Sequence, residues 1–180
     1  MTGESDGLLQ SRVLAGEREV YARLVDRHRD RLGRYALRML GNRADAEDAL
    51  QDTFVRAYRS LARCKPEGFG PWVFGILVNR CRTYAARRAR IQGVMVTDDV
   101  AMARASVEHS EERDGIRDSI RWALEQLPAE QREAFLLKHV EDLSYDAMEE
   151  MTGVRLSALR MRVFRAREEL RKLLAETVRD

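Results

Sequence analysis

Apolar residues recur along most of this chain at intervals of three and four, the spacing that places them on one side of an α-helix. The clearest run is Tyr21, Leu24, Val25, His28, Leu32, Ala36 and Met39. No sustained alternation of apolar and polar residues marks a strand. The sequence therefore predicts an all-α fold. His28 falls within the apolar side, so we interpret it as a hydrogen-bonded core histidine.

Breaks in the pattern divide the chain into separate helices. Gly41 and Asn42 end the first long helix, and a second begins near Arg43. A loop over 65–71 then turns sharply into a helix over 72–90. Further on we expect helices over 116–126 and 129–140, a short helix from an N-cap at Ser144 to Gly153, and a last helix from an N-cap at Ser157 to about residue 175.

Charge is distributed unevenly, although the net charge of all 180 residues is only +2. Residues 1–90 carry a net +7, residues 91–115 a net −4 and residues 116–180 a net −1. Helical periodicity fades over 91–115, so this acidic segment is predicted to be a mobile linker. We therefore expect two small helical domains, over 1–90 and 116–180.

Several classes of protein are excluded by composition. No apolar run approaches the roughly 20 residues that span a bilayer, and the polar start is unlike a signal sequence. Cys64 and Cys81 have no neighbouring Cys or His at metal-ligand spacing, which favours a packing role. We expect a soluble, cytoplasmic protein with no membrane contact and no cofactor.

Three aspartates share one face of the helix after Asn42, because Asp45, Asp48 and Asp52 are spaced three and four residues apart. An ordinary solvated surface would tolerate their mutual repulsion, which costs a few tenths of a kcal/mol per pair. The stripe also suits a basic partner surface. A third interpretation is a magnesium site of a nucleotide hydrolase, but a second carboxylate helix and a phosphate-binding glycine loop are missing.

The helix after Pro71 combines aromatic, amide and basic side chains. Trp72, Ile76, Asn79 and Thr83 project to one side, and arginines accumulate toward its end. Aromatic rings can stack on unpaired bases while arginines follow a single-stranded backbone. The alternative is that Trp72 belongs to the core, where most helical tryptophans lie.

Between Ser157 and Arg167 the chain has four arginines and no acid, directly after a short helix and turn. This arrangement is typical of a helix-turn-helix whose second helix enters a DNA groove. The alternative is a solvated amphipathic helix.

These motifs together resemble extracytoplasmic function (ECF) sigma factors of bacterial RNA polymerase. Residues 45–54 resemble the polymerase-docking helix of the family's region 2, and Phe69, Trp72, Ile76 and Asn79 match the helix that follows. Region 4 is matched at Leu127-Pro128, Gln131-Arg132-Glu133, Phe135-Leu136-Leu137, Leu143-Ser144-Tyr145 and Arg165-Ala166-Arg167.

The resemblance implies a non-enzymatic polymerase subunit that recognises −35 and −10 promoter elements and promotes DNA melting. Its partners would be core RNA polymerase, through the clamp helices of the largest subunit and the flap of the second-largest, promoter DNA, and an anti-sigma factor of the kind that holds family members inactive. Polymerase would contact Asp45, Glu47, Asp48, Gln51, Asp52 and Phe54. The −10 element would contact Lys65, Phe69, Trp72, Asn79, Arg80, Thr83, Arg87 and Arg88. The −35 element would contact Arg155, Ser157, Arg160, Arg162, Arg165 and Arg167.

This chain departs from the family pattern at Glu149, where a small residue is usual and two helices cross closely. The charge must be accommodated there or turn outward. Met151, Thr152, Met161, Thr83 and Gly75 also depart from the pattern. Besides a sigma factor, the sequence allows a sigma-like regulator that docks on polymerase or another partner without specifying promoters and, more distantly, the magnesium-dependent hydrolase.

Overall fold

The computed structural model describes residues 4–95 and 112–177, and within these ranges every regular element is a helix. The predicted all-α fold is confirmed. The chain divides into two compact units, Met1–Tyr84 and Ala85–Asp180. Each unit is described below by itself.

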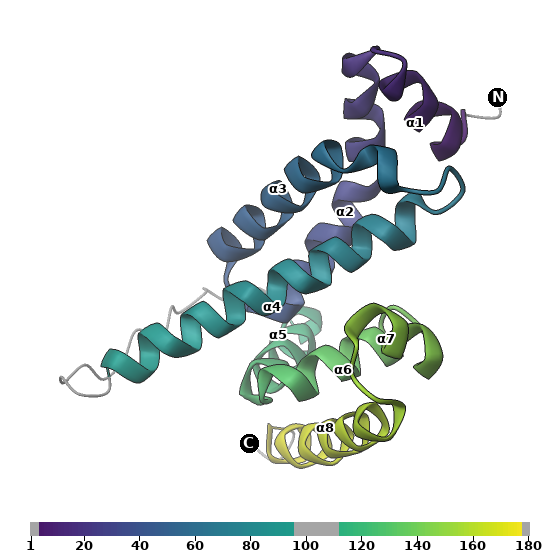
Figure 1. Ribbon diagram of the computed structural model, residues 1–180. Helices are drawn as coiled ribbons and strands as arrows, with labels where there is room; N and C mark the ends of the chain where they lie inside the picture. Colours follow the sequence, from purple (N-terminus) through teal and green to yellow (C-terminus); the bar gives the residue numbers. More distant parts are fainter. Residues whose placement is uncertain (1–3, 96–111, 178–180) are drawn as a thin grey trace. The chain divides into compact units, whose positions relative to one another are not determined.

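The N-terminal unit contains four α-helices, the last of which continues beyond it (Figure 1). They are α1 (Asp6–Leu14), α2 (Tyr21–Leu40), α3 (Arg43–Arg59) and α4 (Phe69–Met95), with short 3-10 helices at Arg18–Val20 (η1) and Leu61–Arg63 (η2). The α2–α3 turn forms as predicted. Gly41 ends α2 with φ of 66°, a conformation that glycine adopts without strain, and the Asn42 side chain caps α3 by accepting from the amide of Asp45.

The core of this unit forms where α2, α3 and α4 face one another. Tyr35 on α2 and Phe74 on α4 are fully buried, and their ring centroids lie 4.9 Å apart in an edge-to-face arrangement. Leu24, Leu32, Ala49, Leu77 and Val78 complete a closely packed interior. This packing fixes the outward faces of α3 and α4.

The C-terminal unit contains α5 (Glu112–Gln126), α6 (Ala129–His139), α7 (Tyr145–Thr152) and α8 (Leu156–Thr177). Ser144 caps α7 as predicted, because its hydroxyl accepts from the amide of Ala147 over 3.1 Å. Gly153, with φ of 68°, ends α7 and allows the tight turn into α8. The buried side of α8 is formed by Leu159, Val163, Ala166 and Leu170.

Several predicted boundaries were wrong. The helix expected to begin at residue 72 begins at Phe69, and Pro71 fits because an amide in the first turn of a helix needs no intrahelical acceptor. Ser157 is not an N-cap, since α8 already begins at Leu156. Helix α1 was not expected. Its signals are an N-cap at Ser5 and apolar residues at Leu9 and Val13.

Helical structure extends into both ends of the segment predicted to be a linker, because α4 continues to Met95 and α5 begins at Glu112. The remainder of that segment, 96–111, lies outside the described residues. Among the helices that are described, none is both long and apolar enough to cross a membrane.

Candidate functional site

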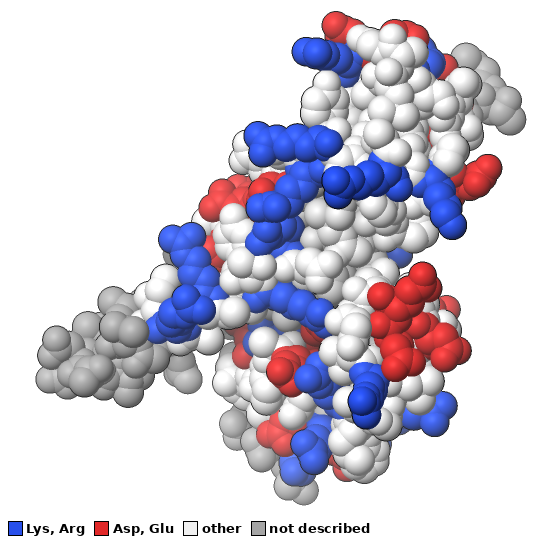
Figure 2. All heavy atoms as spheres, in the orientation of Figure 1, with Lys and Arg blue, Asp and Glu red and all other residues white. Residues whose placement is uncertain are grey.

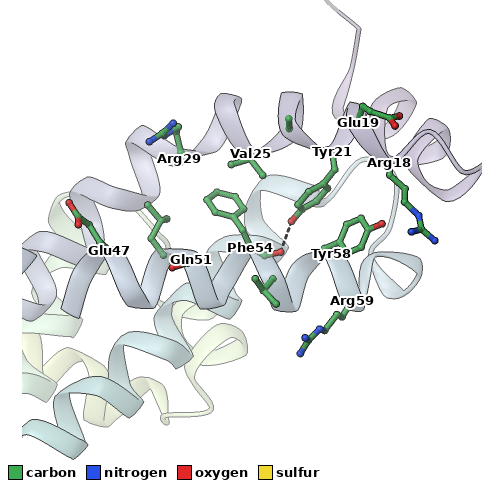
Figure 3. A pocket seen from close by; sticks show the side chains of 13 residues that line it. Arg18, Glu19, Tyr21, Val25, Arg29, Glu47, Gln51, Phe54, Tyr58 and Arg59 are labelled. Atoms are coloured by element: carbon green, nitrogen blue, oxygen red, sulfur yellow. Dashed lines mark hydrogen bonds between the residues drawn. The ribbon is translucent and has the colours of Figure 1, made fainter. Parts of the chain in front are cut away.

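A groove of about 950 Å³ runs between α2 and α3 in the N-terminal unit (Figure 3). Its floor is apolar, with Val25 and Tyr21 contributed by α2 and Phe54 and Tyr58 by α3. The Tyr21 hydroxyl donates to the backbone carbonyl of Phe54 over 2.7 Å, which ties the two helices together at one end of the groove. Burial raises the pKa of Tyr21 well above its ordinary value, so the phenol stays a neutral donor.

The sequence alone did not assign Tyr21, Val25 or Tyr58 to a binding surface. Tyr21 and Tyr58 meet edge to face with ring centroids 5.0 Å apart, and Tyr58 is 38% exposed. Val55 is 40% exposed on the same groove. Exposed apolar side chains that line one concave surface are typical of a binding site for a protein partner.

The six residues predicted to bind polymerase all lie on α3, but they differ in exposure. Glu47, Asp48 and Gln51 are exposed, and Glu47 and Gln51 line the groove. Phe54 is only 8% exposed, so it offers a small part of its ring. The remaining two, Asp45 and Asp52, are partly buried.

Asp52 is already engaged by two arginines within its own unit. Its carboxylate lies 3.0 Å from Arg56 Nε and 3.3 Å from Arg80 Nε. The second pair joins α3 to α4, and the Arg80 side chain is 16% exposed. Asp52 therefore helps to fix the orientation of α4 relative to α3. Over the described residues, no group of three or more acidic, His or Cys side chains is arranged to hold a metal ion.

The residues predicted to read the −10 element extend from the loop before α4 along that helix. Lys65, Asn79, Thr83, Arg87 and Arg88 are exposed, and Trp72 is partly buried. The Thr83 hydroxyl donates to the backbone carbonyl of Asn79 over 3.0 Å. Figure 2 shows Lys and Arg side chains gathered over the face of this unit that carries α4.

Phe69 lies differently from the other members of this set. It is 1% exposed, and its ring lies between His28 and Trp72, with centroid distances of 5.3 Å and 6.0 Å. Its ring is therefore not available to a base in this structure, although it supports Trp72. His28 is hydrogen-bonded, as interpreted from the sequence, since its Nε2 lies 2.8 Å from the Asp6 carboxylate. It lies at the edge of the core rather than within it, because its side chain is 17% exposed.

Cys64 and Cys81 are both buried, and neither forms a disulfide. Burial and the nearby Asp6 carboxylate raise the pKa of Cys64. A buried neutral thiol is a poor nucleophile, which favours the packing role expected for it.

In the C-terminal unit, the predicted DNA-contacting arginines have different surroundings. Arg155, Arg165 and Arg167 are exposed. The Arg160 guanidinium lies 5.5 Å from the centre of the Tyr145 ring, in a cation–π contact. Arg162 is held by Glu130 at 2.6 Å and is 24% exposed, so it is the least available of the set.

The outward face of α8 also carries two apolar residues that were not assigned from the sequence. Met161 is 49% exposed and Phe164 is 60% exposed, on the side of α8 opposite its buried residues. Ser157 and Arg165 lie on the same side by helical spacing. This face therefore combines basic, hydroxyl and apolar groups, which suits base edges in a major groove.

Glu149 is accommodated by the fold rather than turned away from it. The Leu156 amide, in the first turn of α8, donates to the Glu149 carboxylate over 3.2 Å. Acidic side chains gather over α7 in Figure 2. The N-terminal end of α8, which is predicted to contact DNA, is therefore bordered by negative charge.

Comparison with known proteins finds a match to each of the two parts of the chain. Family models of sigma-70 region 2 and sigma-70 region 4 match residues 24–91 and 117–170. The RNA polymerase sigma factor CarQ of Myxococcus xanthus is 33% identical over 162 residues, covering 89% of this chain and 92% of that protein. The chain belongs to the ECF family of RNA polymerase sigma factors.

Further relatives agree with this assignment. This sigma factor is 35% identical over 156 residues to the ECF sigma factor SigE of Mycolicibacterium smegmatis, covering 85% of this chain but only 61% of SigE. Among solved structures, RpoE of Bartonella quintana, in complex with the anti-sigma factor NepR, matches with a TM-score of 0.69 and 26% identity. That match covers 86% of this chain and 96% of RpoE. CnrH, in complex with the cytosolic domain of CnrY, matches with a TM-score of 0.64 and 26% identity over 96% of this chain and 99% of CnrH.

Proposed function

We propose that this sigma factor carries core RNA polymerase to promoters in the cytoplasm, reads a −35 and a −10 element, and opens the DNA from the −10 element to the start site. The observation that carries the proposal is the presence, in order, of both family regions on two compact units. The protein would contribute recognition and leave catalysis to the polymerase.

The α2–α3 groove is the proposed polymerase-docking surface. The groove has an apolar floor, and its charged lining residues are Glu19 and Glu47 together with Arg18, Arg29 and Arg59. It therefore suits a partner helix with apolar anchors and charged flanks, and the clamp helices of the largest polymerase subunit would be that partner. Docking would use the apolar floor for affinity and the exposed carboxylates for orientation. A second contact, between the C-terminal unit and the flap of the second-largest subunit, completes the proposed attachment.

The loop before α4 and the outward face of α4 are the proposed −10 surface. Trp72 offers a stacking face, while Asn79 and Thr83 offer polar groups to base edges. Lys65, Arg87 and Arg88 would follow the phosphates of the non-template strand. Holding an unstacked base offsets the few kcal/mol needed to unpair it, which would let the DNA open without ATP.

The exposed face of α8 is the proposed −35 surface. Arg155, Ser157 and Arg160 lie nearest the reading end of the helix, and Arg165 and Arg167 lie farther along, where phosphates would be met. Met161 and Phe164 would add apolar contact with thymine methyl groups. Two modest DNA contacts on one chain gain affinity through their effective concentration.

An anti-sigma factor is a further proposed partner. RpoE and CnrH were both solved with a binding partner, NepR and CnrY respectively. A protein that covered the α2–α3 groove or the α8 face of this chain would block polymerase or promoter binding.

Permanganate footprinting tests the opening step, because permanganate oxidises thymines only where they are unstacked. Core polymerase with this protein, on a promoter identified by mapping its transcripts, should render thymines reactive from within the −10 element to the start site. Core polymerase alone should not. If this protein bound core polymerase but no mapped promoter showed reactive thymines, the proposal would be contradicted.

A further inference from the structure

Helix α1 lies before the residues that match sigma-70 region 2, yet it contacts the segment proposed to capture the −10 strand. We call residues 65–70 the capture segment. Three separate contacts from α1 or its partners reach this segment or the turn just before it.

The first contact is made by Gln10, which is 2% exposed in the middle of α1. Its side-chain amide donates to the backbone carbonyls of Leu61 over 3.2 Å and Cys64 over 2.7 Å. These carbonyls belong to the turn that leads into the capture segment. A buried amide that bonds two carbonyls fixes the path of the chain at that point.

The second contact depends on Gly7 having no side chain. A Cβ atom placed there would lie 2.8 Å from the carbonyl oxygen of Pro66, inside the capture segment. Any larger residue must push the two backbones apart. Gly7 therefore permits a direct approach of α1 to this segment.

The third contact passes through His28. The Asp6 carboxylate holds His28 Nε2 at 2.8 Å and also accepts from Arg27. The His28 ring lies 5.3 Å from the Phe69 ring, and its Cε1 atom lies 3.2 Å from the position a Cβ would take on Gly70. His28 thus packs against Phe69 and Gly70, the last two residues of the capture segment.

We propose that α1 is a positioning element for −10 strand capture, in which Gln10, Gly7 and the Asp6–His28 pair hold the capture segment in its binding conformation before DNA arrives. This inference rests on the proposed function, since it assigns a role to the surface that reads the strand. A segment containing two glycines and a proline loses conformational freedom when it binds. Ordering it in advance removes that loss from the binding step.

Two substitutions test this role in the full chain bound to core polymerase. Gly7→Ala introduces the methyl group that meets Pro66, and Gln10→Met keeps the size of the side chain while removing both hydrogen bonds. The probes are a labelled single-stranded oligonucleotide carrying the non-template −10 sequence of a mapped promoter, and a duplex carrying its −35 element. We expect strand affinity to fall about tenfold in both variants, because misplacement by a fraction of an ångström disrupts aligned contacts. Affinity for core polymerase and for the −35 duplex should stay within about twofold.

Gly115→Ala is the matched control, because Gly115 also lies in a helix but has nothing within 4 Å of its added Cβ. It should leave both DNA affinities unchanged. Unchanged strand affinity in Gly7→Ala and Gln10→Met would overturn the positioning role. So would an equal loss of strand, duplex and core affinity accompanied by a lower unfolding temperature, because that pattern reports general destabilisation. If the wild-type holoenzyme itself failed to bind the strand, the proposed −10 surface would be wrong, whatever the role of α1.

Discussion

The backbone amide of Leu156 donates a hydrogen bond to the carboxylate of Glu149 over 3.2 Å. Leu156 is the first residue of α8, so this carboxylate lies at the positive end of the helix dipole and satisfies one of the amides that a helix leaves unpaired. A charge that departs from the family pattern therefore caps the helix that carries the arginines predicted to contact DNA. It reaches this amide from the preceding helix, α7.

Removing this cap should destabilise the C-terminal unit. We expect Glu149→Ala to lower the free energy of unfolding by about 1 kcal/mol, the usual contribution of an N-cap, and Glu149→Gln to retain most of it because the amide oxygen still accepts. Chemical denaturation of the full chain measures the difference. Glu150→Ala, at the exposed neighbouring position, is the control. Equal losses in the variants at 149 and 150 would show that the hydrogen bond contributes nothing.

A charge placed in the α2–α3 groove should impair polymerase docking. Val55 is 40% exposed on the groove, so Val55→Glu puts a carboxylate on its apolar surface with little disturbance of the core. We expect at least about tenfold weaker binding to core polymerase, the loss typical of a buried interface anchor. Fluorescence anisotropy of labelled protein titrated with core enzyme gives the affinity.

The control for this substitution is Leu37→Glu, since Leu37 is similarly exposed, at 39%, but does not line the groove. The docking assignment predicts a loss confined to Val55→Glu. Equal affinities of the two variants for core polymerase would show that the groove is not the polymerase-binding surface.

Arg160 and Arg165 should have separable effects on DNA binding. Arg165→Ala should weaken binding to all duplexes alike and reduce the slope of log affinity against log salt by about 1, as expected for one lost phosphate contact. Arg160→Ala should cost about 1–3 kcal/mol at one base pair and relax the preference there. Competition binding with a set of single-base variants of the −35 duplex, repeated at several salt concentrations, resolves both effects. Unchanged affinity in both variants would remove α8 from the DNA interface.

Acid should weaken the attachment of α1. Burial raises the pKa of Asp6, but its hydrogen bonds with His28 and Arg27 outweigh burial, and the pKa lies below its ordinary value of 3.8. A carboxyl group whose pKa is lowered on folding stabilises the folded state above its unfolded pKa, and this contribution is lost as the pH falls through the folded pKa.

Asp6→Asn should therefore unfold more easily than the wild type at pH 7, and the gap should close as the pH falls below 3.8 and passes the folded pKa. Urea denaturation at a series of pH values measures the gap. Asp30→Asn, which alters an exposed carboxylate on α2, serves as the control. A gap that stayed constant down to the lowest pH would contradict the role given to this carboxylate.

Local signals made most of the helices predictable. The seven-member apolar run on α2 ends at Gly41, and the left-handed conformation there is one that glycine readily supplies. Ser144 was correctly predicted as a cap because its acceptor and the amide it serves are three residues apart. Ser157 was misassigned because the group that caps α8 comes from Glu149, seven residues before Leu156, and local capping rules do not reach that far.

Features that depend on distant contacts were not predictable in this way. Gln10 and Cys64 are 54 residues apart in the chain, so nothing near Gln10 indicates that its amide will be buried against that carbonyl. The α2–α3 groove also depends on distant contacts, since Tyr21 and Tyr58 become one surface only when α2 and α3 pack. The roles assigned to the predicted polymerase, −10 and −35 residues stay predictions, and the structure adds which of those side chains are exposed.

Promoter-directed initiation is tested most directly by transcribing genomic DNA with core polymerase in the presence and absence of the full chain, and mapping the start of every transcript. We expect a set of new start sites that appear only with the protein and share two sequence elements at a constant spacing upstream. Core polymerase that bound the protein but gave no new start sites, or new sites with no shared element, would contradict promoter-directed initiation.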